Sequence, residues 1–401
     1  MNKSNAPKLG NENDILIKRK YQRKINNGSL VIRTNSRSKP ELTSLSFIEQ
    51  LNVQKLRIYS NNQTKLKFRS STIVELILEQ RVQPEMKVDD FELENLEILV
   101  LKETKLQNIQ LYNLQKFLKL RSLDISNNYN IDLVHIHNVT SLTYLNLSYC
   151  YLKQINQIES LINLEELDLT QNLLKNIDSI QFLVNLKKLT ADVNSGLDIT
   201  TVKYQNSLEN FSVQYCELKA FSTQQYFINL KQLNLSRNYQ INVNEQMKYL
   251  TNLTNLEMEL CELVSVTALR PLTNLESLNL YNNNIVYVDN EFNDMKKLEQ
   301  LNLSLNLISD FTSLQKHQNF SKFNLLNQRP PLYTQLLLAK KVKNVENTNI
   351  QLIKINKQRQ KMFYFRQKIN KPIESTQINL IQFTSNVVRF FQVISSSECF
   401  E

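Results

Sequence analysis

Four stretches of the chain repeat one pattern of leucines: LTYLNLSYCYL at residues 142–152, LEELDLTQNLL at 164–174, LKQLNLSRNYQI at 230–241 and LEQLNLSLNLI at 298–308. The leucines that open such stretches recur every 22 to 24 residues, at Leu96, Leu120, Leu142, Leu164, Leu186, Leu208, Leu230, Leu253, Leu275 and Leu298. A period this regular over ten copies predicts a solenoid in which each copy forms one coil of a continuous stack. It overrides the division into several domains that the length of the chain suggests.

Each coil divides into a strand and a return segment. Apolar and polar residues alternate through the two middle leucines, which predicts a short strand with the leucines facing inward. Apolar residues then recur at every third position, as at Leu174, Ile177, Ile180 and Leu183. This period fits a 3₁₀ helix better than an α-helix. Burial of a large apolar side chain contributes roughly 1.5–3 kcal/mol, so stacked coils should share a stable core.

Asparagine or cysteine follows each strand at a fixed distance. Asparagine stands there at Asn128, Asn172, Asn194, Asn238, Asn283 and Asn306, and cysteine at Cys150, Cys216 and Cys261. We expect the asparagine amides to bond buried backbone groups of neighbouring coils, which must find partners. Adjacent strands are about 4.8 Å apart, so these cysteines should lie roughly 10–15 Å from one another, too far for a disulfide. Extra residues after Asn128, Asn194 and Asn238 should bulge at the turn.

The consensus L-x-x-L-x-L-x-x-N/C-x-L with a three-residue return period resembles one class of leucine-rich repeat. This class occurs in the regulatory subunit of protein phosphatase 1 and in bacterial internalins. The resemblance covers about residues 50–327. It implies an α/β repeat solenoid, a horseshoe with parallel strands on the concave face and 3₁₀ or short helices on the convex face. It also implies that a phosphatase or another signalling or cytoskeletal protein could be the partner.

Three regions are predicted. Residues 1–40 should form a disordered basic N-terminal tail, and residues 41–327 the solenoid of about 12–13 repeats, the first two and the last atypical. Residues 328–401 should form a basic helical C-terminal appendage. Within it the spacing of Leu380, Phe383, Val387, Phe390 and Ile394 fits either a short coiled coil or an intramolecular helical hairpin.

The net charge of +10 is divided unevenly along the chain. Residues 1–40 and residues 328–401 each carry +8, and residues 41–327 carry −6. The basic run Lys18-Arg19-Lys20-Tyr21-Gln22-Arg23-Lys24 could import the protein into the nucleus or bind nucleic acid or anionic lipid, although a solvated tail is the favoured interpretation. The chain contains neither a long apolar run nor the apolar core of a signal peptide at its start. We therefore expect a cytoplasmic protein without a transmembrane segment, a nuclear location being left open.

No constellation of residues points to catalysis. The chain has three glycines, too few for glycine-rich phosphate loops. His135, His137 and His317 have no cluster of cysteines or carboxylates beside them in the sequence, so surface histidines are favoured over metal ligands. Nucleophile, kinase and zinc-protease motifs are absent from the sequence. We therefore predict that the protein is not an enzyme and has no catalytic residues, metal or cofactor.

The concave face is the main candidate for function. Its outward positions form a polar, mildly acidic strip with scattered tyrosines, which suits protein recognition. The predicted partner-binding residues are Tyr144, Tyr149, Asp168, Asp192, Tyr215, Glu257, Glu259 and Tyr281. The alternative for any one of them is an ordinary solvated residue, because a solenoid must place polar side chains there.

Three functions from different classes follow from this sequence. The favoured one is a non-catalytic intracellular scaffold or adaptor that binds a protein partner on the concave face. The second is a protein whose basic tails bind nucleic acid or a membrane surface while the solenoid acts as a spacer. The third is a structural protein that self-associates through residues 375–394.

Overall fold

A computed structural model describes residues 21–33, 46–60, 67–80, 88–103, 113–129, 131–203, 205–221, 226–288, 290–308, 310, 313–314, 320–325 and 328. All of them belong to the first of two units, Met1–Gln351. The second unit, Leu352–Glu401, lies outside the described residues, and so do His317 and the predicted helices of the appendage.

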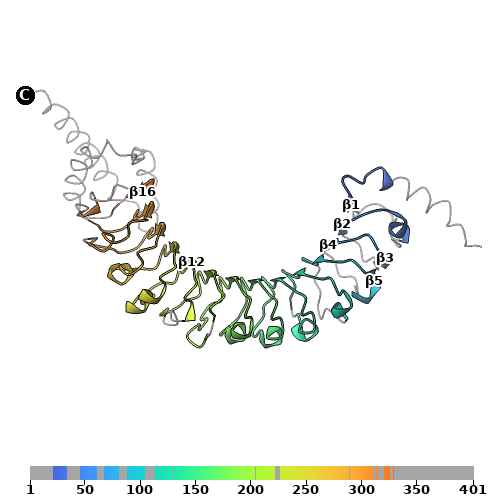
Figure 1. Cartoon of the computed structure of the whole chain (residues 1–401), viewed down its shortest axis with the longest axis horizontal. Coiled ribbons are helices and arrows are strands. Elements are labelled where there is room, and N and C mark those ends of the chain that lie inside the picture. The colour runs from blue at the N-terminus through green and yellow to red at the C-terminus, as the bar shows by residue number, and fades with distance from the viewer. Residues whose placement is uncertain are drawn as a thin grey trace, which may run out of the picture. The chain divides into compact units, whose positions relative to one another are not determined.

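One parallel sheet runs through this unit in chain order (Figure 1). Its 14 strands are β1 (Ser29–Arg33), β2 (Lys55–Ser60), β4 (Glu75–Gln80), β6 (Ile98–Val100), β7 (Ser122–Asp124), β8 (Tyr144–Asn146), β9 (Glu166–Asp168), β10 (Lys188–Thr190), β11 (Asn210–Ser212), β12 (Gln232–Asn234), β13 (Asn255–Glu257), β14 (Ser277–Asn279), β15 (Gln300–Asn302) and β16 (Lys322–Asn324). The register places the middle residue of each short strand opposite that of the next, as in Leu123↔Leu145 and Leu145↔Leu167. The predicted ribbon of parallel strands with inward leucines is confirmed.

The return segments form 3₁₀ helices on the outer side of the sheet (Figure 1). They are η1 (Ser46–Gln50), η2 (Val88–Asp90), η3 (Leu114–Lys116), η4 (Leu133–His135), η5 (Asn156–Ile158), η6 (Asp178–Phe182), η8 (Glu245–Tyr249) and η9 (Thr267–Leu269). Two of the first coils instead contribute β3 (Phe68–Ser70) and β5 (Phe91–Leu93), which pair with each other. None of the helices in the described part of the chain is long and apolar enough to cross a membrane. The predicted three-residue period is therefore confirmed as 3₁₀ structure.

A single hydrophobic core runs between the two layers. It is a contiguous cluster of buried side chains from Leu30 to Leu314, and the leucines that open the coils, such as Leu142 and Leu164, are fully buried in it. Each coil can bury its apolar side chains only against its neighbours, so the stack rather than the single coil is the stable unit.

The asparagines at the end of the strands join consecutive coils as predicted. The Asn172 side chain is buried, and its Nδ2 donates to the carbonyl oxygens of Leu147 in the preceding coil and Leu169 in its own coil, both at 2.9 Å. Its Oδ1 accepts the backbone N–H groups of Cys150 at 3.1 Å and Leu152 at 2.9 Å. One carboxamide thus bonds four buried backbone groups, of which only the Leu169 carbonyl oxygen has another partner, Asn194 Nδ2 at 3.0 Å.

A cysteine at the same position can replace the donor side of these hydrogen bonds but not the strong acceptor that the asparagine oxygen provides. The Sγ of Cys216 donates to the carbonyl oxygen of Ala191 at 3.2 Å, but a thiol is a weak acceptor. The preceding coil carries the extra residue Gly196, whose N–H donates instead to the Cys216 carbonyl oxygen at 3.0 Å. Gln240 bonds the Cys261 carbonyl oxygen in the same way at 3.2 Å. The three described cysteines are buried free thiols, as expected.

The sheet begins before the predicted start of the solenoid at residue 41. Strand β1 lies within the predicted tail, and its Leu30 and Ile32 are fully buried opposite Leu56 and Ile58. The expectation of disorder is therefore wrong for residues 29–33. The physical reason is the alternation in SLVIR, which supplies two inward apolar side chains in spite of the basic surroundings. At the other end Gln328, predicted to open the appendage, donates from Nε2 to the Leu303 carbonyl oxygen at 2.6 Å, as the asparagines do. The remaining boundaries stay a prediction.

Candidate functional site

The outward side chains of the sheet form columns because the strands are in register. The central column consists of Asp124, Asn146, Asp168, Thr190, Ser212, Asn234, Glu257, Asn279 and Asn302, all half-buried. We call the outward-facing side of the strands from β6 to β16 the concave face. All eight predicted partner-binding residues lie on its strands or on the turns that follow them.

Aspartate and asparagine in the central column have a structural task. The Oδ1 atoms of Asp124 and Asp168 accept the N–H two residues further on, from Ser126 and Thr170, each at 2.9 Å. Asn146 makes the same bond to Ser148 at 2.9 Å. These bonds turn the chain at the end of each strand, as Asx turns do. The turn explains why the column holds aspartate or asparagine, a role that the sequence analysis did not assign.

Asp192 and Tyr215 meet in a concavity of about 280 Å³ on this face. Its lining consists of Thr170, Asp192, Val193, Gln214, Tyr215 and Arg237. Asp192 accepts hydrogen bonds from the Ser212 hydroxyl at 2.6 Å and the Gln214 N–H at 2.8 Å. Burial raises the pKa of Asp192 above its ordinary value, although these hydrogen bonds act in the opposite direction. Asp192 therefore anchors the neighbouring coil, whereas Tyr215, 52% exposed, is available to a partner.

Glu257, Glu259 and Tyr281 lie together at β13 and β14. Glu257 accepts a hydrogen bond from Asn279 Nδ2 at 2.7 Å, and its pKa is raised mainly by burial and further by the charge of Glu259. Glu259 faces the other way along the sheet, where its Oε1 lies 3.5 Å from Arg237 Nε. The Arg237 side chain thus joins this group to the concavity around Asp192 and Tyr215.

Tyr144 and Asp168 lie on adjacent strands near the middle of the sheet. Tyr144 stands between Ser122 and Glu166 in the register, and Asp168 is two strands away from Asp124. The pKa of Tyr144 is raised first by burial and then by the charges of Asp124 and Asp168. The carboxylates of this part of the sheet are therefore close enough to act on the tyrosine ring.

The turns after the strands hold their tyrosines in a restricted conformation. Tyr149 and Tyr215 have positive φ values of 59° and 53°. Their N–H groups donate to the carbonyl oxygens of Thr170 at 2.8 Å and Ser236 at 3.0 Å in the next coil. A positive φ is uncommon for residues other than glycine, and both tyrosines are exposed, Tyr149 to 40% and Tyr215 to 52%. The ladder of hydrogen bonds holds the backbone of both turns in place before any partner binds.

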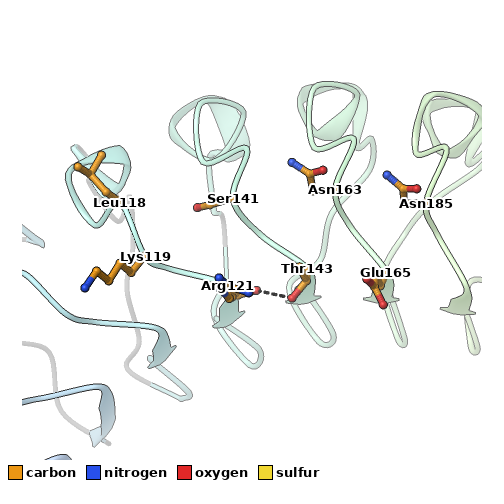
Figure 2. A pocket seen from close by; sticks show the side chains of 8 residues that line it. All are labelled: Leu118, Lys119, Arg121, Ser141, Thr143, Asn163, Glu165 and Asn185. Carbon is orange, nitrogen blue, oxygen red and sulfur yellow. Dashed lines mark hydrogen bonds between the residues drawn. The ribbon is translucent and has the colours of Figure 1, made fainter.

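A second concavity, of about 490 Å³, lies on the flank where the return segments enter the strands (Figure 2). It contains Leu118, Lys119, Arg121, Ser141, Thr143, Asn163, Glu165 and Asn185. Asn163 Nδ2 donates to the Thr140 carbonyl oxygen and Asn185 Nδ2 to that of Ile162, both at 2.9 Å. These asparagines form a second ladder, which the sequence analysis missed although asparagine recurs directly before the opening leucines. The flank concavity is thus lined by groups that hold coils together.

The described histidines lie away from the concave face. His135 ends η4, and His137 follows on the same return segment with its ring against the Val134 carbonyl oxygen. Within the described ranges, no group of three or more histidines, cysteines and carboxylates is placed to hold a metal ion. The arrangement offers contact surface, hydrogen bonds and charge, all of which suit the binding of another molecule.

Comparisons with known proteins agree with the fold. A family model of leucine-rich repeats, two copies, matches residues 273–316, and no curated protein sequence matches the chain. A solved internalin of Listeria monocytogenes is 20% identical with a TM-score of 0.51 over 79% of this chain and 89% of its own. A leucine-rich repeat protein of Leptospira interrogans is 20% identical with a TM-score of 0.53 over 80% and 95%. A chain of the Drosophila Toll–Spätzle complex is 18% identical with a TM-score of 0.55, and this chain spans 78% of itself but 53% of that one. The resemblance expected from the sequence is confirmed at the level of the fold.

Proposed function

Because the chain is a leucine-rich repeat protein, we propose that it is a non-catalytic scaffold or adaptor that holds a protein partner against its concave face. The observation that carries this proposal is the concavity in which the exposed ring of Tyr215 stands between Asp192 and Arg237. Tyrosine and arginine are over-represented among residues that dominate binding energies at protein interfaces.

The rigidity of the face supports the same function. Tyr149 and Tyr215 are held by backbone bonds to the next coil, so little conformational entropy is lost when a partner orders their surroundings. The central column and its turns offer further hydroxyl, amide and carboxylate groups in fixed rows. A long surface of this kind can make many contacts with one extended partner.

The intracellular setting belongs to the proposal as well. It rests on the sequence features given above and on the reduced state of three buried cysteines. A phosphatase, signalling or cytoskeletal protein remains the class of partner that the repeat type implies.

Position-specific photo-crosslinking tests the proposal. A photoreactive phenylalanine analogue replaces Tyr215 on the concave face in one variant and Tyr249 on η8 in a matched control. We expect a defined protein to be cross-linked through position 215 and not through position 249. With that partner purified, Tyr215→Asn should weaken binding about tenfold or more, since asparagine tolerates positive φ and only the ring is lost. Tyr249→Asn should leave the affinity unchanged. Equal cross-linking from both positions, or an unaltered affinity of Tyr215→Asn, would overturn the proposal.

A further inference from the structure

The charges of the concave face are concentrated on four neighbouring strands. The outward positions from β7 to β10 are Ser122, Asp124, Ser126, Tyr144, Asn146, Ser148, Glu166, Asp168, Thr170, Lys188, Thr190 and Asp192. These twelve positions hold four carboxylates and one ammonium group, Lys188, which lies 3.3 Å from Glu166. The equivalent positions on β11 and β12 (Asn210, Ser212, Gln214, Gln232, Asn234 and Ser236) carry no charge. We call the outward positions of β7–β10 the acidic face.

Tyr144 lies in the middle of this acidic face. It is the first residue of β8, and Asn146, two residues further on, stands between Asp124 of β7 and Asp168 of β9 in the register. Since adjacent strands are about 4.8 Å apart, the two aspartates lie roughly 10 Å from each other with the tyrosine strand between them. An aromatic ring attracts a cation to its face, and carboxylates beside it strengthen that attraction.

We propose that the acidic face binds a protein segment rich in arginine and lysine, with one basic side chain placed over Tyr144 and directed toward Asp124 and Asp168 on the two adjacent strands. This inference rests on the proposed function and names the chemistry of the partner. The argument for this occupant is charge complementarity, because a net negative sheet face with a central tyrosine repels acidic partners and attracts basic ones. The uncharged face of β11 and β12 would contact the adjoining part of the partner through hydrogen bonds.

Variants that leave the turns intact are available in this fold. Asparagine already occupies the central column at Asn146, Asn234, Asn279 and Asn302, where its Oδ1 accepts the same N–H as the aspartates. Asp124→Asn/Asp168→Asn therefore removes two negative charges and keeps the hydrogen bonds. The matched control is Glu276→Gln/Glu299→Gln, which removes two negative charges from the exposed residues that directly precede β14 and β15. Both variants have the same net charge.

The probes are two fluorescein-labelled peptides that alternate serine with either arginine or glutamate, measured by anisotropy against the full chain. We expect the arginine peptide to bind and the glutamate peptide not to bind. Asp124→Asn/Asp168→Asn should weaken binding of the arginine peptide about tenfold, and the control pair by less than about threefold. Tyr144→Phe should retain binding, whereas Tyr144→Thr should lose about fivefold because the ring is absent.

The inference is overturned if the arginine peptide fails to bind, if the glutamate peptide binds as tightly, or if the two double variants lose affinity equally. These outcomes differ from a failure of the proposed function, which is read from where the natural partner cross-links. A partner that cross-links at position 215 while the arginine peptide fails to bind would remove only the inference. Circular dichroism of each variant should match that of the native chain, as the retained hydrogen bonds require.

Discussion

Coils with asparagine after the strand and coils with cysteine there are joined to the preceding coil through different atoms. Asn172 uses its side-chain oxygen to accept the N–H groups of Cys150 and Leu152. Cys216 has no such oxygen, and its backbone carbonyl accepts the N–H of Gly196 instead. In that preceding coil the N–H of Leu197 bonds the carbonyl oxygen of Asn194 at 3.1 Å. In a coil without an inserted residue, the N–H of Leu174 donates to the side-chain oxygen of Asn194 in the next coil, also at 3.1 Å.

The difference explains why two departures from the repeat consensus, an inserted residue after the asparagine and a cysteine in the next coil, occur together. The extra residues follow Asn128, Asn194 and Asn238, and the next coil in each case ends its strand with Cys150, Cys216 or Cys261. Coils that precede an asparagine, such as those of Asn172 and Cys216, have no extra residue. The insertion supplies a backbone route for N–H groups that a thiol accepts only weakly. An inserted residue and a cysteine 20 or 21 residues later, as in Gly196 with Cys216 and Gln240 with Cys261, therefore compensate each other.

Loss of an asparagine carboxamide should give the largest effect. Asn172→Ala leaves three buried backbone groups without partners, since the Leu169 carbonyl oxygen keeps its bond from Asn194, so we expect the free energy of unfolding to fall by about 3–5 kcal/mol. Cys150→Ala removes only weak Sγ hydrogen bonds and a small volume, and should cost roughly 1 kcal/mol. Urea unfolding followed by circular dichroism gives both values. Similar costs for the two variants would contradict the role given to the carboxamide.

Exchange of a cysteine for the consensus asparagine should destabilise the protein. In Cys216→Asn the new Oδ1 faces a coil whose N–H groups are already bonded, which should cost about 1–3 kcal/mol. Deletion of Gly196 alone should also destabilise the fold, but deletion combined with Cys216→Asn should recover most of the loss. A double-mutant cycle by urea unfolding measures this coupling. Strictly additive costs would show that the insertion and the cysteine are independent.

The inserted residues allow a smaller, reciprocal test. Gly196 and Gln240 occupy equivalent positions with positive φ values of 69° and 62°. Gly196→Ala should cost about 1 kcal/mol, because a side chain is disfavoured in the left-handed region. Gln240→Gly should be neutral or stabilise by up to about 0.5–1 kcal/mol, since the relief of strain is partly offset by the entropy of glycine. A stabilising Gly196→Ala or a destabilising Gln240→Gly in thermal unfolding would refute the shared geometry.

The native protein, without any substitution, allows a further test of the cysteine coils by thiol chemistry. Burial raises the pKa of each of the three thiols to about 12. A thiol reagent at pH 8 should therefore leave Cys150, Cys216 and Cys261 unmodified in the native protein and label them in urea, and mass spectrometry counts the labels.

The raised thiol pKa also predicts a dependence of stability on pH. The folded state keeps its thiols protonated above the ordinary pKa of 9.0, so the free energy of unfolding should decline from pH 9 towards pH 12. Cys216→Ala should reduce that decline, and rapid native labelling would contradict the burial.

The coil itself could be predicted because each part of it has a local cause. Alternation around Leu145 and Leu167 gave the strands, and the spacing of Leu174, Ile177 and Ile180 gave the 3₁₀ segments. The bonds of Asn172 and Asn238 followed from the need to satisfy buried backbone groups. The start of the sheet at β1 departs from the prediction because a short apolar alternation suffices to form a strand within a basic segment.

The candidate site could be predicted only in outline. The outward position of Asp168, Asp192 and Tyr215 follows from the side-chain period of a strand. That Asp192 anchors Ser212 and Gln214 while Tyr215 stays exposed depends on contacts between residues about 20 apart in the chain. The positive φ of Tyr149 and Tyr215 likewise depends on carbonyl oxygens in the next coil. No single coil contains the information.

The sequence by itself determined that the chain is a stack of coils with leucines inside and polar residues outside, because a 22-residue period repeats the same local preferences in every copy. Only the tertiary structure decided which coil is joined to which by a side chain or by the backbone, and which acidic groups anchor the sheet or face a partner. The reason is that hydrogen bonds and charges act between neighbouring coils, so each depends on a residue 20 or more positions away in the chain.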